Sequence, residues 1–147
     1  MSVAVLVDTN VLVYVFDHDE PEKRTRAIQT VARLTSSGAG AVTAQVLGEF
    51  FNVVRRRFPG VLDLDEAVAQ VGRYADQFRT YDTTVAVVLE ALRGVARYQF
   101  SYYDAQIWAC ARVNRIPLVL SEDFADGAVI EGARFVNPFA EGASGLE

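Results

Sequence analysis

The chain has 147 residues, of which 51% are hydrophobic and 22% are charged, and its formal net charge is −5. This length suits one domain, and the composition is that of a globular protein rather than a disordered one. A single cysteine, Cys110, excludes an internal disulfide and suits a reducing cytoplasm. The sequence has neither a signal peptide nor the apolar run of about 20 residues that a membrane helix needs. It therefore predicts a soluble, cytoplasmic protein without a membrane partner.

The negative charge argues against a nucleic-acid partner, because proteins that bind nucleic acids usually carry excess positive charge. Two features weaken that argument. Carboxylates that hold a metal ion count as negative in the sequence, but the bound ion neutralises them. In addition, all 14 basic residues except Lys23 are arginines, whose planar side chain binds phosphate through two hydrogen bonds. An arginine-rich composition also has a simple genomic explanation.

Strand and helix patterns alternate along the chain. Val3–Val7 is a continuous apolar run, typical of a strand that is buried on both faces. The later predicted elements are, in order, helices from residue 10 and at 21–34, a loop at 36–40, a strand at 41–43, helices at 44–57, 64–79 and 85–98 with an extended link at 80–82, a helix at 101–114, a strand at 117–120 and an edge strand at 134–136. Short strands separated by helices predict an α/β fold with a central parallel sheet and right-handed crossovers. We expect one domain at residues 1–140 and a loose tail at 141–147.

Two acidic residues follow the two most apolar predicted strands. Asp8 comes directly after the first strand, and Asp123 comes within three residues of the strand at 117–120. Taken alone, Asp8 could be a helix N-cap and Asp123 an exposed loop residue. However, ligands of open parallel sheets bind beyond the carboxyl ends of the strands. The shared position of the two acids therefore favours a functional site there.

Glu49 and Asp104 each lie on the predicted apolar face of a helix. A carboxylate in that position must be paired, protonated or bound to a metal, because burying it bare costs several kcal/mol. Two structural alternatives stay open. Glu49 could reach water at the edge of its face or pair with Arg97, and Asp104 could complete a capping box with Ser101.

A shared metal site would explain all four acids. Clustered carboxylates repel one another unless a cation lies among them. Ligand sets made of oxygen alone suit Mg²⁺ or Mn²⁺, which promote the hydrolysis of phosphodiester bonds. Other chemistries fit poorly, since the one histidine, His18, lies in a predicted solvated turn and the chain has no phosphate-binding loop. Among the aromatic residues, we expect only the pair Tyr102 and Tyr103 to face a substrate.

Four segments resemble the motifs of PIN domains, and of the VapC ribonuclease toxins among them. They are Val7-Asp8-Thr9-Asn10-Val11-Leu12, Gln45-Val46-Leu47-Gly48-Glu49-Phe50, Phe100-Ser101-Tyr102-Tyr103-Asp104-Ala105 and Leu120-Ser121-Glu122-Asp123-Phe124, joined by Val136-Asn137-Pro138-Phe139 near the end. The resemblance implies an α/β/α sandwich and a Mg²⁺- or Mn²⁺-dependent endoribonuclease that uses Asp8, Glu49, Asp104 and Asp123. It also implies an RNA substrate, a homodimer, and neutralisation by an antitoxin encoded alongside.

The resemblance also assigns supporting residues and has one gap. Asn10 and Ser121 match polar positions beside the family's acids and are expected to supply hydrogen bonds, with Thr9 as a further candidate. Many members carry another aspartate two residues after the fourth acid, where this chain has Ala125. Glu122 and Asp126 are the possible substitutes for it.

Three other functions remain as alternatives. A phosphatase of the haloacid dehalogenase type would need a second aspartate at position 10, where this chain has Asn10. A receiver-like signalling module would need a lysine after a late strand, but Lys23 lies in an early helix. A degenerate PIN domain would bind RNA or protein without cleaving it.

An inhibitory partner is expected to bring positive charge into the acidic cleft. Four clustered carboxylates without metal attract a guanidinium, which pairs with two of them at once. The antitoxin would also place an apolar helix in a groove of this domain. The candidate walls of that groove are the helices that carry Ile28, Val31, Phe50 and Phe51, and the alternative is that these side chains simply belong to the core.

Overall fold

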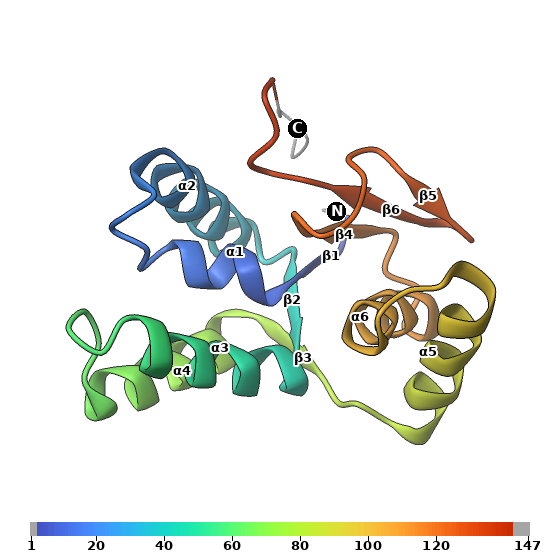
Figure 1. Cartoon of the computed structure of the whole chain (residues 1–147), viewed down its shortest axis with the longest axis horizontal. Coiled ribbons are helices and arrows are strands. Elements are labelled where there is room, and N and C mark those ends of the chain that lie inside the picture. The colour runs from blue at the N-terminus through green and yellow to red at the C-terminus, as the bar shows by residue number, and fades with distance from the viewer. Residues whose placement is uncertain (1–2, 143–147) are drawn as a thin grey trace.

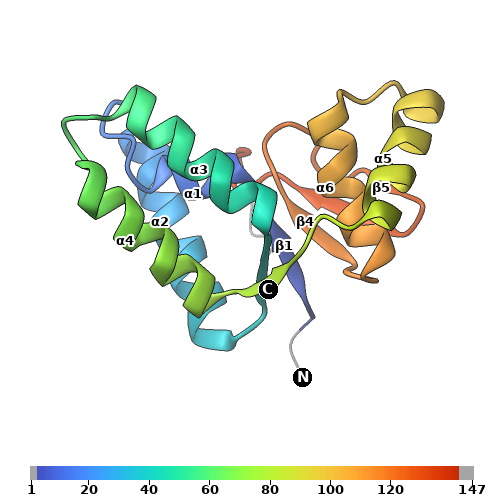
Figure 2. The same ribbon diagram turned by 90° about the horizontal axis from the view of Figure 1, so that it is seen from below.

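The computed structural model describes residues 3–142 and consists of one mixed sheet with helices packed around it (Figure 1). The elements in chain order are β1 (Val5–Val7), α1 (Thr9–Tyr14), α2 (Pro21–Ser37), β2 (Gly40–Thr43), α3 (Ala44–Arg57), α4 (Leu64–Gln77), β3 (Arg79–Tyr81), α5 (Val85–Tyr98), α6 (Tyr102–Val113), β4 (Leu118–Leu120), β5 (Val129–Ile130) and β6 (Ala133–Val136). Helices α1 to α4 form one group and α5 and α6 form another, with the strands between them (Figure 2).

The sheet has the strand order β3-β2-β1-β4-β6-β5. All neighbouring strands are parallel except β5 and β6, which form an antiparallel pair. Strand β1 is central, and the chain continues from it to β2 on one side and later to β4 on the other. Such a reversal of strand order opens a crevice at the carboxyl ends of the strands. In the register of β1 and β4, Val7 lies opposite Leu120, so the residues that follow the two strands are neighbours.

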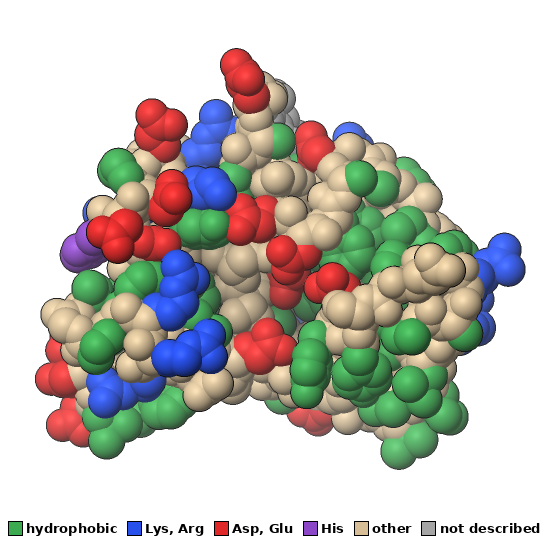
Figure 3. All heavy atoms as spheres, in the orientation of Figure 1, with side chains coloured by type: hydrophobic (Ala, Val, Ile, Leu, Met, Phe, Trp, Pro, Cys, Tyr) green, Lys and Arg blue, Asp and Glu red, His purple; other side chains and the backbone are tan. Residues whose placement is uncertain are grey.

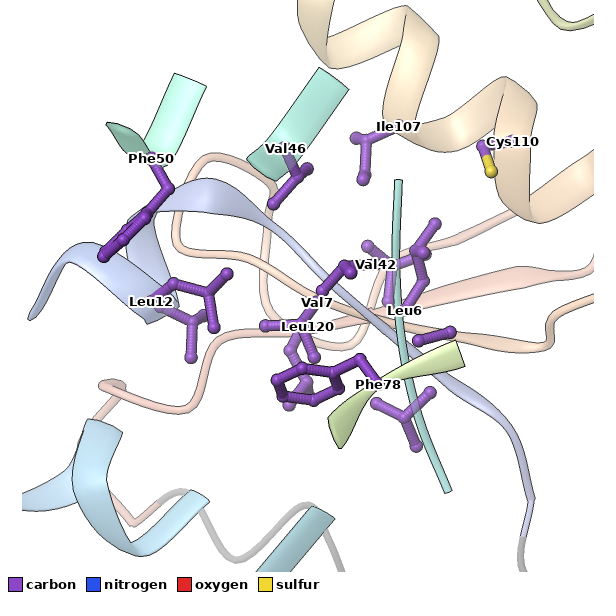
Figure 4. Close-up of a cluster of buried hydrophobic side chains, with 14 of the residues drawn as sticks. Leu6, Val7, Leu12, Val42, Val46, Phe50, Phe78, Ile107, Cys110 and Leu120 are labelled. Atoms are coloured by element: carbon purple, nitrogen blue, oxygen red, sulfur yellow. The ribbon is translucent and has the colours of Figure 1, made fainter. Parts of the chain in front are cut away.

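The core lies between the sheet and the helices that cover it. Leu6, Val7 and Val42 of the central strands are completely buried and pack with side chains from the helices (Figure 4). Helices α5 and α6 approach each other closely at Gly94, where a Cβ atom would lie 2.7 Å from the ring of Trp108. A larger residue at this position would therefore force the Trp108 ring or the helix backbone to move. No helix within residues 3–142 is both long and apolar enough to cross a membrane.

Five of the helices begin at a residue whose side chain caps the helix. These N-cap residues are Asp8, Thr43, Asp63, Thr84 and Ser101, and each accepts a hydrogen bond from a backbone N–H of the first turn. Such caps satisfy amides that have no partner inside the helix. They also set the point at which each helix begins, and for α1 and α6 that point lies beside the crevice.

The predicted α/β fold with a central parallel sheet is confirmed, and the structure differs from several of the predicted elements. Residues 79–81 are a strand, β3, which pairs with β2, whereas the sequence suggested a link. The strand predicted at 134–136 is present as β6, but it is not at the edge of the sheet, because β5 pairs with it through a tight turn. In this turn Glu131 and Gly132 both have positive φ angles, 49° and 88°, as a two-residue hairpin turn requires. Helix α2 continues to Ser37 and ends at Gly38, which has a φ of 72°. Most of the predicted tail at 141–147 lies outside the described residues.

Candidate metal centre

Three of the four predicted acids meet at the carboxyl ends of β1 and β4. Asp8, Asp104 and Asp123 each offer a carboxylate oxygen, and these oxygens all lie within 4.8 Å of one another. Asp8 is the N-cap of α1, Asp104 lies in the first turn of α6, and Asp123 lies in the loop after β4. The group thus combines a strand end, a helix and a loop that are far apart in the sequence.

The three aspartates line a cavity of about 230 Å³. Acidic side chains gather around this hollow, in the middle of the face shown in Figure 3. Glu49 lines the same cavity, and so do Thr9 and Asn10. The cavity therefore contains all four predicted acids, but Glu49 is not one of the three residues whose oxygens meet.

Asp8 is the most deeply buried of the four predicted acids. Its side chain is 9% exposed, and it accepts hydrogen bonds from the Ser121 hydroxyl at 2.7 Å and the Thr9 amide at 2.8 Å. Burial raises the pKa of Asp8 from 3.8 to about 7, although the two hydrogen bonds lower it; the charges of Asp123 and Asp104 add to the increase. Asp8 is thus a helix cap, as the alternative interpretation held, and also a carboxylate whose ionised form a nearby cation would stabilise.

Ser121 and Asn10 hold the loop after β4 against the first helix. The Ser121 hydroxyl donates to Asp8 and accepts from the Asp123 amide at 3.1 Å. The Asn10 side chain donates to the Asp123 carboxylate at 3.2 Å and to the Ser121 hydroxyl at 3.4 Å, and its carbonyl accepts from the Glu122 amide at 3.4 Å. Partial desolvation in the cavity, followed by the charge of Asp104, raises the pKa of Asp123. The two polar residues therefore orient a carboxylate that is itself destabilised by its surroundings.

Glu49 is held at the wall of the cavity by two uncharged donors. The Thr9 hydroxyl donates to one carboxylate oxygen and the Gln45 amide to the other, both at 3.0 Å. The alternative partner Arg97 instead donates to the Tyr98 hydroxyl. Glu49 is half-buried, so hydrogen bonds rather than an ion pair compensate for its loss of water. Gln45 was not predicted, although its position four residues before Glu49 on one helix was a usable signal.

Asp104 leaves its carboxylate free. Its backbone amide donates to the Ser101 hydroxyl at 3.3 Å, which is half of the predicted capping box. The other half is missing, because within residues 3–142 the Asp104 carboxylate accepts no hydrogen bond from Ser101. The residue therefore lies in the first turn of α6 with both carboxylate oxygens available to a ligand.

Neither candidate for the missing fifth acid joins the three aspartates. Glu122 accepts a hydrogen bond from the Tyr14 hydroxyl at 2.7 Å and pairs with Lys23 at 3.1 Å. Asp126 accepts from the Asn137 amide at 2.9 Å. The contacts of Tyr14 and Lys23 had no signal in the sequence, since they depend on how α1 and α2 pack beside the loop after β4. Glu122 is thus paired with a cation, Lys23, whereas the three aspartates have no such partner in the part of the chain that the structure describes.

The electrostatics of the cavity favour a cation. None of the ion pairs within residues 3–142 involves Asp8, Asp104 or Asp123. Three neighbouring carboxylates without a positive partner repel one another, and oxygen ligands of this kind suit Mg²⁺ or Mn²⁺. The donor set therefore fits a hard divalent ion.

Phe50 cannot line a groove for a partner, as the sequence suggested, because it is completely buried in the core. Phe51 and Val31 are half-buried and pack against the same core, while Ile28 is 39% exposed. Of the four proposed wall residues, only Phe50 is thus excluded. It lies on the side of α3 that faces the core, and a helix exposes only the residues on its other sides.

Comparison with known families assigns the fold. Residues 5–125 match the model of the PIN domain family, and the protein belongs to that family. No curated protein matches the sequence.

Solved structures with the same fold include several toxin–antitoxin proteins. A chain of a toxin–antitoxin complex from Klebsiella pneumoniae is 18% identical, with a TM-score of 0.69, and the match covers 92% of this protein and 98% of that chain. The Mycobacterium tuberculosis toxin VapC20, described as cleaving the sarcin–ricin loop, is 22% identical, with a TM-score of 0.62 and coverage of 79% and 87%. DNA-bound VapBC from Salmonella typhimurium is 17% identical, with a TM-score of 0.62 and coverage of 90% and 96%.

Proposed function

We propose that this protein is a Mg²⁺- or Mn²⁺-dependent endoribonuclease that acts in the cytoplasm. One observation carries the proposal: carboxylate oxygens of Asp8, Asp104 and Asp123 lie within 4.8 Å of one another, and none of the three residues forms an ion pair within residues 3–142. These three residues would hold the ion, and Glu49 would face it from the cavity wall. A bound ion of this kind lowers the pKa of water and stabilises negative charge on an attacked phosphate.

The other cavity residues have supporting tasks in this proposal. Ser121 donates to Asp8 and accepts from the Asp123 amide, so it holds the distance between these two acids. Asn10 orients the Asp123 carboxylate, and Thr9 orients Glu49. Residues that orient ligands in this way commonly change metal affinity or activity 10- to 100-fold when they are replaced.

Cleavage of mixed single-stranded RNA by the purified protein tests the activity. We expect cleavage with Mg²⁺ or Mn²⁺, none with EDTA, and recovery when the ion is restored. Single-stranded DNA and a phosphomonoester serve as controls against a DNase or a phosphatase. Asp104→Asn should be inactive, whereas Asp76→Asn, which changes an exposed aspartate of α4 outside the cavity, should retain activity. An equally active Asp104→Asn would place the reaction elsewhere, and a folded protein that binds RNA without cleaving it would be a degenerate member of the family.

We further propose that the protein is the toxin of a toxin–antitoxin pair. Arg57 also lines the cavity but pairs with Asp17, and within residues 3–142 no ion pair involves the three aspartates. A guanidinium from a partner matches two carboxylates better than a lysine does. Complexes with antitoxins are known for structural relatives from Klebsiella pneumoniae and Salmonella typhimurium. Co-expression with the product of the neighbouring gene should yield a complex with reduced ribonuclease activity. A neighbour that neither binds nor inhibits would remove the toxin–antitoxin proposal and leave the ribonuclease proposal standing.

A homodimer is the assembly that we propose for the free protein. Val85, Leu89 and Leu92 of α5 are 75%, 63% and 50% exposed and recur with helical spacing, so they form an apolar stripe with no charged residue in it. Burial of this stripe against a second copy would remove it from water. Sedimentation of the protein and of Leu89→Glu tests the interface. We expect a dimer for the natural sequence and a monomer for the variant.

A further inference from the structure

Tyr103 is the one residue of its aromatic pair that faces solvent. It is 61% exposed in the first turn of α6, directly before Asp104. Its neighbour Tyr102 is half-buried against the core, and its hydroxyl accepts a hydrogen bond from Gln106 at 3.3 Å. Tyr102 therefore packs against the core, whereas most of Tyr103 lies at the surface.

The Tyr103 ring borders the cavity of the three aspartates. Within residues 3–142 its one ring contact is with Tyr102, edge to face, with the centroids 5.3 Å apart. Its hydroxyl makes no hydrogen bond to any of the described residues. A large aromatic side chain so weakly held has no visible part in folding, and it stands at the edge of the site where phosphodiester cleavage is proposed.

We propose that Tyr103 is the stacking platform for an unpaired base next to the cleaved phosphodiester. The inference rests on the proposed ribonuclease function and names its substrate class, single-stranded RNA or a loop. A single ribose joins a base to its phosphate, and Tyr103 directly precedes Asp104. A phosphate held beside the aspartates therefore brings one of its two flanking bases to this ring.

Stacking requires a base that is not already stacked in a duplex. Proteins that recognise single-stranded RNA place unpaired bases on aromatic rings, and each such contact commonly changes affinity severalfold to a hundredfold. In a continuous duplex the bases are paired and stacked on each other, and they cannot reach the ring. Tyr103 thus selects unpaired nucleotides at the cleavage site. Because every base has an aromatic face, the ring itself imposes no strict base identity.

A cycle of enzyme and substrate changes tests the contact. The cleavage site is first mapped on a short single-stranded RNA, and two further RNAs are made that lack the base on the 5′ or the 3′ side of the cut. We expect one of these abasic RNAs, and Tyr103→Ala with the intact RNA, each to raise KM about 5- to 100-fold with a smaller effect on kcat. Combining the two changes should add nothing further, because each removes the same contact.

Two controls separate stacking from a general effect. Tyr103→Phe keeps the ring and should lose much less than Tyr103→Ala, whereas Tyr103→Leu should behave like the alanine variant. Val129→Ala removes a side chain of similar exposure, 63%, on the distant edge strand β5, and should leave KM unchanged. Binding of uncleaved RNA to Asp8→Asn, with and without Tyr103→Ala, gives a second measurement that does not require turnover.

The outcomes distinguish this inference from the ribonuclease proposal. If the natural protein cleaves RNA and Tyr103→Ala leaves KM unchanged, the platform is refuted while the ribonuclease stands. Additive effects of Tyr103→Ala and the abasic RNA would also refute it, because the two changes would then act on different contacts. If the natural protein cleaves no RNA, the underlying function fails first, and the binding measurement with Asp8→Asn decides whether Tyr103 still binds bases.

Discussion

Two groups of neighbouring carboxylates in this protein differ in whether positively charged side chains offset their mutual repulsion. In the Glu131 cluster, which consists of Glu90, Arg93, Arg112 and Glu131, arginines lie between the acids. Arg93, and then the Tyr98 hydroxyl, lower the pKa of Glu131 to about 2. In the cavity, burial raises the pKa of Asp8 to about 7, and no ion pair involves Asp8, Asp104 or Asp123 within residues 3–142.

This difference in ion pairing distinguishes a cluster that stabilises the fold from a site that can bind a ligand. The Glu131 cluster is complete in itself and joins the turn between β5 and β6 to helices α5 and α6 through Arg93 and Arg112. The three aspartates are incomplete, because their mutual repulsion is relieved only by protonation or by a cation, and residues 3–142 pair none with them. Strongly perturbed acids in a cavity are a common feature of functional sites. Four measurements would sharpen or break this comparison.

The largest expected effect is that of Asp8→Asn on cleavage. The change removes a candidate metal ligand while keeping the size of the side chain. We expect activity to fall by more than about 100-fold, beyond the 10- to 100-fold typical of residues that only orient ligands. The metal-free variant should be more stable than the natural protein at pH 8, by about 1 to 3 kcal/mol, because it avoids a buried charge. Retained activity or a clear loss of stability would contradict the comparison. Activity assays and thermal melting measure both.

The next largest effect concerns the pH dependence of stability without metal. The pKa of Asp8 is about 7 in the folded protein, compared with 3.8 for an ordinary aspartate. Between about pH 4 and 7, Asp8 is therefore protonated in the folded state but ionised in the unfolded state. Stability should therefore fall as the pH rises from about 4 to 7 and stay level above it. Between pH 5 and 8 the loss is about 3 kcal/mol, or roughly 6 to 12 °C in melting temperature.

Two controls accompany the pH measurement. Excess Mg²⁺ or Mn²⁺ should raise the melting temperature more at pH 8 than at pH 5, because the ion binds ionised carboxylates. Asp8→Asn should lack the decline that the natural protein shows without metal. A flat profile for the metal-free natural protein would mean that Asp8 stays charged without a cation.

Ser121→Ala is expected to have an intermediate effect. Its hydroxyl connects Asp8 and the Asp123 amide, so its loss should weaken metal binding or activity about 10- to 100-fold. Asp63→Ala is the control, since Asp63 caps α4, and neither it nor any residue of α4 lines the cavity; the change should cost about 1 kcal/mol of stability without changing metal affinity. Calorimetric titration with the metal ion measures the metal affinity of each variant, and melting curves measure its stability. Equal metal affinity for both variants would remove Ser121 from the site.

The smallest effect is expected for Glu131→Gln, which tests the structural cluster. Because the pKa of Glu131 is lowered to about 2, its charge stabilises the fold above about pH 4.5, and this contribution is lost as the pH falls through 2. The variant should melt slightly below the natural protein at pH 7 and level with it at pH 2. Its metal affinity and cleavage should be unchanged. A loss of activity would mean that the two clusters are coupled.

Much of the fold follows from local patterns in the sequence. The apolar run that ends at Val7 and the one that ends at Leu120 identify the central strands, since a strand buried on both faces has few polar residues. The predicted helix at 85–98 matches α5 in both bounds. The two-residue strand β5 escaped prediction because its turn contains Glu131 at a positive φ, a conformation that glycine and asparagine usually mark.

The sequence alone determined which acids follow strands or lie on inward helix faces, because these features depend on residues a few positions apart. The tertiary structure alone decided which of them meet. Asp8 and Ser121 are 113 positions apart and touch because β1 and β4 pair in one register. The same packing gives Glu122 a cation, Lys23, and holds Glu49 with Thr9 and Gln45 at the wall. A carboxylate's partners depend on distances of a few ångströms between separate elements, and no local pattern encodes those distances.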